Sequence, residues 1–183
     1  RRRGRADMHR NFQAALIVAT WVVLALSFVH ADRLQDQPLH HVPTVLGLIG
    51  LGWLARTRGV SDASMISMVL FIWLHVLGAR YIYSFVPYDD WSNSWFGFSV
   101  TSTFHFTRNH YDRFVHAAYG VLAMKPQVEL LRRRFGLGSG SALCFSVVLV
   151  LAVSALYEIV EWAIAVAMAP AWADRYNGQQ GDG

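Results

Sequence analysis

Three long, uncharged, apolar runs limit what this chain can fold into more than any other feature of its sequence. They cover Phe12–Val29, Ala63–Ala79 and Phe135–Tyr157. Each is close to the roughly 20 residues that a helix needs to cross the hydrocarbon core of a bilayer. Charged residues make up only 15% of the chain, against about 25% in soluble domains. The sequence therefore predicts an integral membrane protein, with the lipid bilayer as its partner.

The periodic apolar segments predict an all-α fold, a polytopic bundle of transmembrane helices that forms a single domain over residues 1–183. Five spans are expected, at about 12–30, 42–56, 62–85, 111–125 and 141–169. The fourth is the least hydrophobic, which is typical of a helix surrounded by other helices. His40 and His41 fall in the predicted loop before the second span and are interpreted there as ordinary polar residues.

The distribution of lysine and arginine predicts a direction of insertion. The N-terminus and the loops after the second and fourth spans carry 11 of the 16 basic residues, and the opposite side carries four. The positive-inside rule then places the N-terminus in the cytoplasm and predicts a multi-pass protein of the bacterial inner membrane. This pattern also explains the sequence pI of about 9.6, so no nucleic-acid partner is expected.

Ionisable side chains of three predicted spans fall at a similar depth, in the half of the bundle opposite the basic loops. They are His75 on the third span, Asp112 and His116 on the fourth, and Glu158 and Glu161 on the fifth. The spacings i, i+4 and i, i+3 put each pair on one helix face. Charged groups inside a membrane usually face the bundle interior and have a partner. The two glutamates would repel each other, so a positive group or a shared proton is expected between them.

Three interpretations of this group stay open. The first is a structural ion-pair network in which Arg80, Arg108 and Arg113 balance the carboxylates. The second is a divalent metal site for zinc, iron or manganese, with His75, Asp112, His116, Glu158 and Glu161 as ligands. The third is a pathway for protons or substrate. Asp182, in the C-terminal segment, is a further candidate ligand.

Four ordered motifs resemble a known family. They are LHVLGARYIYSFVPYD (Leu74–Asp89), RNHYDRFVHAAYG (Arg108–Gly120), SALYEIVEW (Ser154–Trp162) and NGQQGD (Asn177–Asp182). Together they are similar to the YjdF-like family of bacterial inner-membrane proteins, whose function is not established. A fainter similarity joins the chain to the VanZ-like membrane family.

The resemblance implies a set of motif residues that overlaps the group placed at one depth. The polar motif residues are His75, Tyr81, Tyr83, Arg108, Asn109, Asp112, Arg113, His116, Tyr157, Glu158, Glu161, Gln180 and Asp182. In the resembled family the last motif leads into further acidic residues and another helix, whereas this sequence stops at Gly183. A sixth helix and further ligands are therefore expected beyond it.

Two functions follow as hypotheses. In the first, the protein is a metal-dependent membrane enzyme acting on a lipid-like substrate, with Glu158 or Glu161 as the catalytic base. Around them, Arg80, Tyr81, Arg108, Asn109, Arg113, Gln180 and Asp182 would bind substrate or complete a polar network. In the second, the protein is a non-enzymatic transporter or an accessory subunit of a membrane complex, and its polar cluster holds helices or other membrane subunits together.

Overall fold

The described part of the chain is built from helices. The computed structural model describes residues 2–31, 34, 37–57 and 59–167, and no strand occurs among them. The helices are α1 (Arg2–Ser27), α2 (Gln37–Arg56), α3 (Asp62–Arg80), α4 (Tyr88–Phe96), α5 (Val100–Thr103), α6 (Tyr111–Leu122), α7 (Met124–Phe135) and α8 (Ser139–Ala167). The all-α class is confirmed. Three segments are long and apolar enough to cross a membrane: Met8–Ser27, Asp62–Arg80 and Ser139–Ala163.

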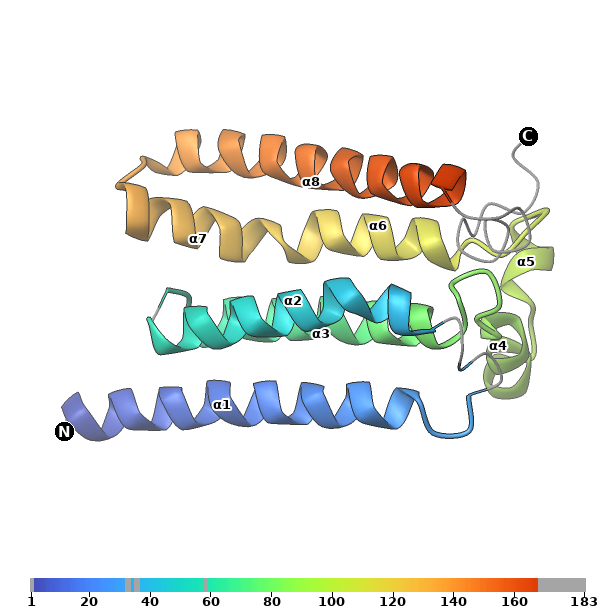
Figure 1. Cartoon of the computed structure of the whole chain (residues 1–183), viewed down its shortest axis with the longest axis horizontal. Coiled ribbons are helices and arrows are strands. Elements are labelled where there is room, and N and C mark those ends of the chain that lie inside the picture. The colour runs from blue at the N-terminus through green and yellow to red at the C-terminus, as the bar shows by residue number, and fades with distance from the viewer. Residues whose placement is uncertain (1, 32–33, 35–36, 58, 168–183) are drawn as a thin grey trace.

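The long helices lie side by side, and α6 and α7 follow each other along one line (Figure 1). The start of α1, the α2–α3 connection and the α7–α8 connection share one end of the bundle. We call this the basic end, because Arg10, Arg56 and residues 132–134 belong to it. The short helices α4 and α5 lie at the other end, which we call the aromatic end for its exposed Trp95, Phe96, Phe98 and Phe104. The basic segments are thus grouped as the sequence predicts.

A dry core joins α1, α2 and α3. Its buried members include Leu24 on α1, Leu48 on α2, and Met65, Val69 and Ile72 on α3. Lipid chains are as apolar as this core, so the hydrophobic effect contributes little to packing the helices inside a membrane. The close dispersion contacts between these side chains stabilise the bundle instead.

The third helix ends at Arg80 rather than at the predicted residue 85. The chain turns back there, with Ile82 and Tyr83 both in the left-handed backbone region at φ 49°. The amide of Tyr83 donates to the Gly78 carbonyl at 2.7 Å, and the Tyr83 ring packs against Gly78. A Cβ at Gly78 would come within 2.4 Å of that ring. Glycine at this position therefore lets Tyr83 fold back against α3.

The predicted fourth span is two helices that meet at Ala123. Pro126 causes the break, since it has no N–H to donate to the Leu122 carbonyl four residues earlier and its ring crowds that carbonyl. The freed carbonyl accepts a hydrogen bond of 2.6 Å from the Ser67 hydroxyl on α3. The residues expected to form a loop after Lys125 continue instead as α7, to Phe135.

The second helix begins at Gln37 rather than at residue 42, so the interpretation of His40 and His41 as loop residues is wrong. Both lie inside α2, with exposed fractions of 2% and 3%. The His41 Nε2 atom lies 3.2 Å from the Ser27 hydroxyl, at the end of α1. Buried polar groups usually have hydrogen-bond partners of this kind.

Candidate functional site: a cavity with a polar end

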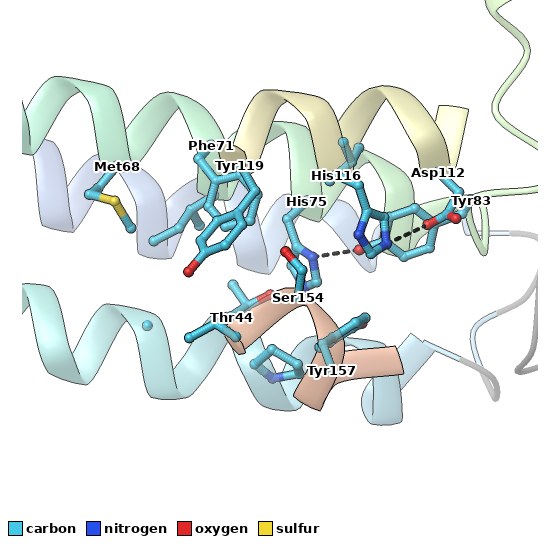
Figure 2. Close-up of a pocket in the computed structure, with 15 residues that line it drawn as sticks. Thr44, Met68, Phe71, His75, Tyr83, Asp112, His116, Tyr119, Ser154 and Tyr157 are labelled. Carbon is cyan, nitrogen blue, oxygen red and sulfur yellow. Dashed lines mark hydrogen bonds and ion pairs between the residues drawn. The ribbon is translucent and has the colours of Figure 1, made fainter. Parts of the chain in front are cut away.

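A cavity of about 190 Å³ lies between α2, α3, α6 and α8. Its lining residues are Pro43, Thr44 and Gly47 on α2, Met68, Phe71, Ile72 and His75 on α3, Tyr83 in the turn after α3, Asp112, Val115, His116 and Tyr119 on α6, and Val153, Ser154 and Tyr157 on α8. Met68, Phe71 and Tyr119 lie toward one end, while Asp112, His116 and Tyr83 lie toward the other (Figure 2). The cavity is therefore apolar at one end and polar at the other.

The polar end is centred on His116. Its Nε2 atom lies 3.5 Å from a carboxylate oxygen of Asp112 and 3.4 Å from a carboxylate oxygen of Glu158. An unprotonated nitrogen would be repelled by both oxygens, so this arrangement requires a proton shared among the three groups. Asp112 and His116 share a face of α6 at spacing i, i+4, and Glu158 reaches them from α8. The contact that Glu158 makes here is therefore with His116, whereas the sequence led us to expect Arg113 or a cation held with His116 as its partner.

His75 stands beside this cluster in the same cavity and has an exposed fraction of only 7%. Its Nε2 atom lies 3.1 Å from the carbonyl oxygen of His40, and its Nδ1 atom is hydrogen-bonded to the Tyr83 hydroxyl. Because a carbonyl can only accept, Nε2 carries the proton and Nδ1 accepts from Tyr83. Both ring nitrogens of this predicted metal ligand are therefore occupied by protein partners.

The polar end lies near the ends of its helices, and the apolar part of the cavity lies deeper. Asp112 is in the first turn of α6, at the aromatic end of the bundle. Met68 lies seven residues before His75 on α3, which corresponds to about 10 Å along the helix. The Asp112 side chain lines the cavity and is 48% exposed, whereas Glu158, 49% exposed, lies beside the lining in contact with His116. A molecule in the cavity can therefore reach the Asp112 carboxylate and the His116 ring.

Several other predicted site residues lie away from the cavity and hold the fold. The Arg80 guanidinium donates to carbonyl oxygens of Ser27, Val29 and His30 at the end of α1. Tyr81 packs its ring against Trp91, with ring centroids 6.0 Å apart. The bonds of Arg80 thus go to backbone carbonyls, whereas the ion-pair interpretation paired Arg80 with carboxylates.

The segment before α6 is structural as well. The Asn109 side chain donates to the Val86 carbonyl at 2.8 Å and accepts from the Tyr111 amide at 2.9 Å. The Arg108 carbonyl accepts from His110 at 2.9 Å, and Arg113 contacts the other nitrogen of His110 at 2.8 Å. These bonds fix the start of α6 and so position Asp112 and His116.

The predicted ligands do not form one compact set. Neither Glu158 nor Glu161, three residues further along α8 and half-buried, is among the residues that line the cavity. Within the described residues, no group of three or more His, Cys, Asp or Glu side chains is placed to hold a metal ion. Metal binding is therefore not supported there. Gln180 and Asp182 lie outside the described residues.

Sequence reasoning missed several residues of the site. Thr44 and Tyr119 line the cavity, yet neither stood out as a polar residue at the right depth. Outside the cavity, Glu129 on α7 was also overlooked: its carboxylate accepts from the Ser61 amide at 2.9 Å and from the Ser61 hydroxyl at 2.8 Å. It thereby caps the start of α3, where a carboxylate is favourable. The sequence signal for Glu129 was a single acidic residue in a basic segment. Its partner, the N-cap residue Ser61, is distant in the sequence, so the contact itself could not be predicted.

The chain is similar to a family of membrane proteins and to one of the curated proteins. Residues 12–183 match the family model described as "Predicted membrane protein (DUF2238)". The chain is also 34% identical over 116 residues to the inner membrane protein YjdF of Escherichia coli (strain K12), a match that covers 61% of this chain and 51% of that protein. The chain thus spans about half the length of this curated relative. No solved structure matches it. Because the family model covers nearly the whole sequence, the chain belongs to the DUF2238 family of membrane proteins, as its resemblance to YjdF-like proteins predicts.

Proposed function

We propose that this protein is a multi-pass inner-membrane enzyme that binds a lipid-like, amphipathic molecule in the cavity and acts on its polar head. One observation carries the proposal: apolar lining at membrane depth ends in the Asp112, His116 and Glu158 cluster near the helix ends. A lipid in a bilayer has the same order, with an apolar chain inside and a polar head at the surface. The cavity therefore suits such a molecule in its normal orientation.

The chemistry that fits this cluster is general acid–base catalysis. The proton shared by His116 and the two carboxylates can move to or from a hydroxyl or amine placed at the polar end. A positioned group of this kind typically contributes about 10²–10⁴-fold to a rate. Glu158, in contact with His116, is the better placed of the two predicted bases, and Glu161 is the second.

The proposal includes five membrane crossings with the N-terminus in the cytoplasm. The helices α6 and α7 have 12 residues each, or about 18 Å at 1.5 Å per residue. Neither is long enough alone for a hydrocarbon core of about 30 Å. In line with each other, they together make the fourth crossing. The excess of basic residues at the basic end supports the orientation.

A second candidate is a non-enzymatic transporter or an accessory subunit of a membrane complex. The structural roles of Arg80, Asn109 and Glu129 favour it, because much of the polar network holds helices together. In that case the Asp112, His116 and Glu158 cluster would connect α6 to α8 without chemistry. A divalent metal at the polar end, whether zinc, iron or manganese, is a separate hypothesis that metal analysis of the purified protein tests.

Native mass spectrometry of the protein released from bacterial membranes tests the proposal. We expect the wild type to retain a bound amphiphile and His116→Asn to lose it. The matched control is His105→Asn, because His105 is exposed and lies at φ 54°, a backbone region that asparagine tolerates. Wild-type protein without an amphiphile, or equal retention by both variants, would contradict the proposal. The same spectra report any bound metal.

A further inference from the structure

The cavity has an open side between α2 and α8. Both helices line it, through Pro43, Thr44 and Gly47 on one side and Val153, Ser154 and Tyr157 on the other. Within the described residues, however, α2 and α8 do not pack against each other. Helix α3 packs against α2 and α6, and α6 packs against α8. The walls are therefore continuous on three sides and interrupted on the fourth.

The open side faces the hydrocarbon of the bilayer. On α2, the apolar side chains of Leu46 and Ile49 have exposed fractions of 64% and 60%. On α8, those of Leu156 and Ile159 have exposed fractions of 60% and 59%. In a bundle that spans a membrane, apolar side chains exposed at this depth contact lipid chains. An acyl chain beside these helices would meet the gap without passing through water.

The lining of the polar end selects the head of the molecule. The Asp112 carboxylate lines this end and offers acceptors, Glu158 lies beside it at 3.4 Å from His116, and no lysine or arginine occurs among the described lining residues. Phosphate sites in proteins usually present arginine, lysine or free backbone amides. A head that donates hydrogen bonds, such as a hydroxyl or an amine, complements the carboxylates, whereas an anionic head would be repelled.

The size of the cavity limits the apolar part. A dry apolar cavity of about 150 Å³ holds a benzene ring, and the cavity here measures about 190 Å³. It therefore has room for a segment of one hydrocarbon chain and not for two. We infer that the ligand is a membrane lipid with a hydroxyl or amine head, one chain of which enters sideways from the bilayer between α2 and α8. This inference rests on the proposed function of the cavity.

Three photoreactive probes that differ only in the head test the choice of lipid. They are a long-chain alcohol, amine and carboxylic acid, each with a diazirine in the chain, used with the full-length protein in lipid nanodiscs at pH 8. We expect the alcohol, the amine or both to label cavity residues of α3 and α6, and the acid to label them clearly less. Labelling by only one of the first two identifies the head. Equal labelling by the acid would overturn the assignment of the head.

Two pairs of variants test the entry route. Gly47→Phe and Ser154→Phe place a ring at the open side. Gly50→Phe and Ala155→Phe make the same change at positions on the same helices that do not line the cavity. A Cβ at Gly47 meets only Ile72 at 3.6 Å, and one at Gly50 meets nothing within 4 Å, so α2 has room for a side chain at both positions.

We expect Gly47→Phe and Ser154→Phe to reduce cavity labelling by about tenfold, the size of effect that one misfit group has in an apolar pocket. The two controls should stay at the wild-type level. If the cavity is labelled equally in all four variants, the lateral route is wrong while the proposed function stands. A third outcome is that no probe labels the cavity of the wild type although all of them label lipid-facing residues such as Trp53. A protein segment would then cover the gap, and both the proposed function and the lateral entry of a lipid would be wrong.

Discussion

At the scale of single residues, the state of His75 is fixed by two neighbours, Tyr83 and the carbonyl of His40. Tyr83 reaches His75 only because the chain reverses after Arg80, and that reversal needs a glycine at position 78. One glycine thus determines the shape and the polarity of a cavity wall. The sequence predicts His75 near Asp112 and His116, and all three line the cavity, but the sequence could not predict a reversal that depends on two left-handed residues.

The substitution Gly78→Ala should therefore destabilise the fold. The added methyl group would meet the Tyr83 ring at 2.4 Å, and overpacking of this kind typically costs about 1–3 kcal/mol. The matched control is Gly50→Ala, where nothing lies within 4 Å; there, alanine should stabilise the helix by about 0.5–1 kcal/mol. Unfolding of the purified proteins in mixed micelles measures both. A neutral Gly78→Ala would mean that Tyr83 does not pack on α3.

The Asp89 carboxylate organises the segment at the aromatic end. Its oxygens accept hydrogen bonds from the Ser99 hydroxyl and the Thr101 amide, both at 2.9 Å, and from the Thr101 hydroxyl. Partial burial alone would raise the pKa of Asp89, but these hydrogen bonds outweigh burial and hold the pKa below its ordinary value. This bonding ties α4 to α5.

A pH dependence follows for this segment. Because the folded-state pKa of Asp89 lies below the unfolded value of about 3.9, its stabilisation is complete above that value and is lost as pH falls through the folded pKa. A spin label at the exposed Thr103, in a Cys144→Ala background, should become more mobile on acidification. Asp89→Asn should give the mobile spectrum already at pH 7. A label equally immobile in Asp89→Asn would show that this carboxylate does not hold the segment.

At the scale of helices, the predicted fourth span, which is the least hydrophobic, differs most from its prediction, because it is two helices and not one. Its break follows from Pro126, which is visible in the sequence, but the compensating bond from Ser67 depends on how α3 and α6 pack. Uncharged runs predicted the membrane-crossing parts of α1, α3 and α8, because length and hydropathy determine them, but α1 begins at Arg2, ten residues before the predicted start. The ends of helices were less predictable, since Gln37 and Tyr83 obtain their positions from tertiary contacts.

The bond between Ser67 and Leu122 gives a test of the break. Ser67→Ala should destabilise the protein by about 0.6–1.7 kcal/mol, the range found for hydrogen bonds between membrane helices. In a Pro126→Ala background the same change should cost much less, because residue 126 would then supply an N–H for the Leu122 carbonyl. Additive effects in this double-mutant cycle would contradict the role given to Pro126.

At the scale of the whole molecule, Asp112, His116 and Glu158 come together as the sequence predicts, and three of the five predicted spans are single helices long and apolar enough to cross a membrane. The order of the helices brings the start of the predicted fourth span and the second half of the fifth to one end of the bundle. The spacing of Asp112 and His116 then puts both side chains on one face of the fourth span. The predicted metal ligands did not assemble as one set, because His75 is turned to His40 and Tyr83. The spacing of residues in the sequence determines which helix face carries a histidine. It does not determine which group forms a hydrogen bond with each nitrogen of the ring.

The orientation can be tested by cysteine labelling of intact cells, in a Cys144→Ala background. Asn93 and Ser139 are both exposed and lie at opposite ends of the bundle. With the N-terminus in the cytoplasm, a membrane-impermeant maleimide should label Asn93→Cys and spare Ser139→Cys until the cells are opened. The reverse pattern would invert the protein in the membrane and place the cluster on the cytoplasmic side.

The central claim is that the cavity holds an amphipathic molecule with its polar head beside His116. The most direct measurement is an experimental density map of the protein in native-lipid nanodiscs. We predict continuous, chain-like density from the region of Met68 to His116, bounded by α3, α6 and α8, with a head near Asp112 and Glu158. A cavity filled by protein side chains, or an α8 that lies away from α6 and leaves Glu158 facing lipid, would contradict the claim.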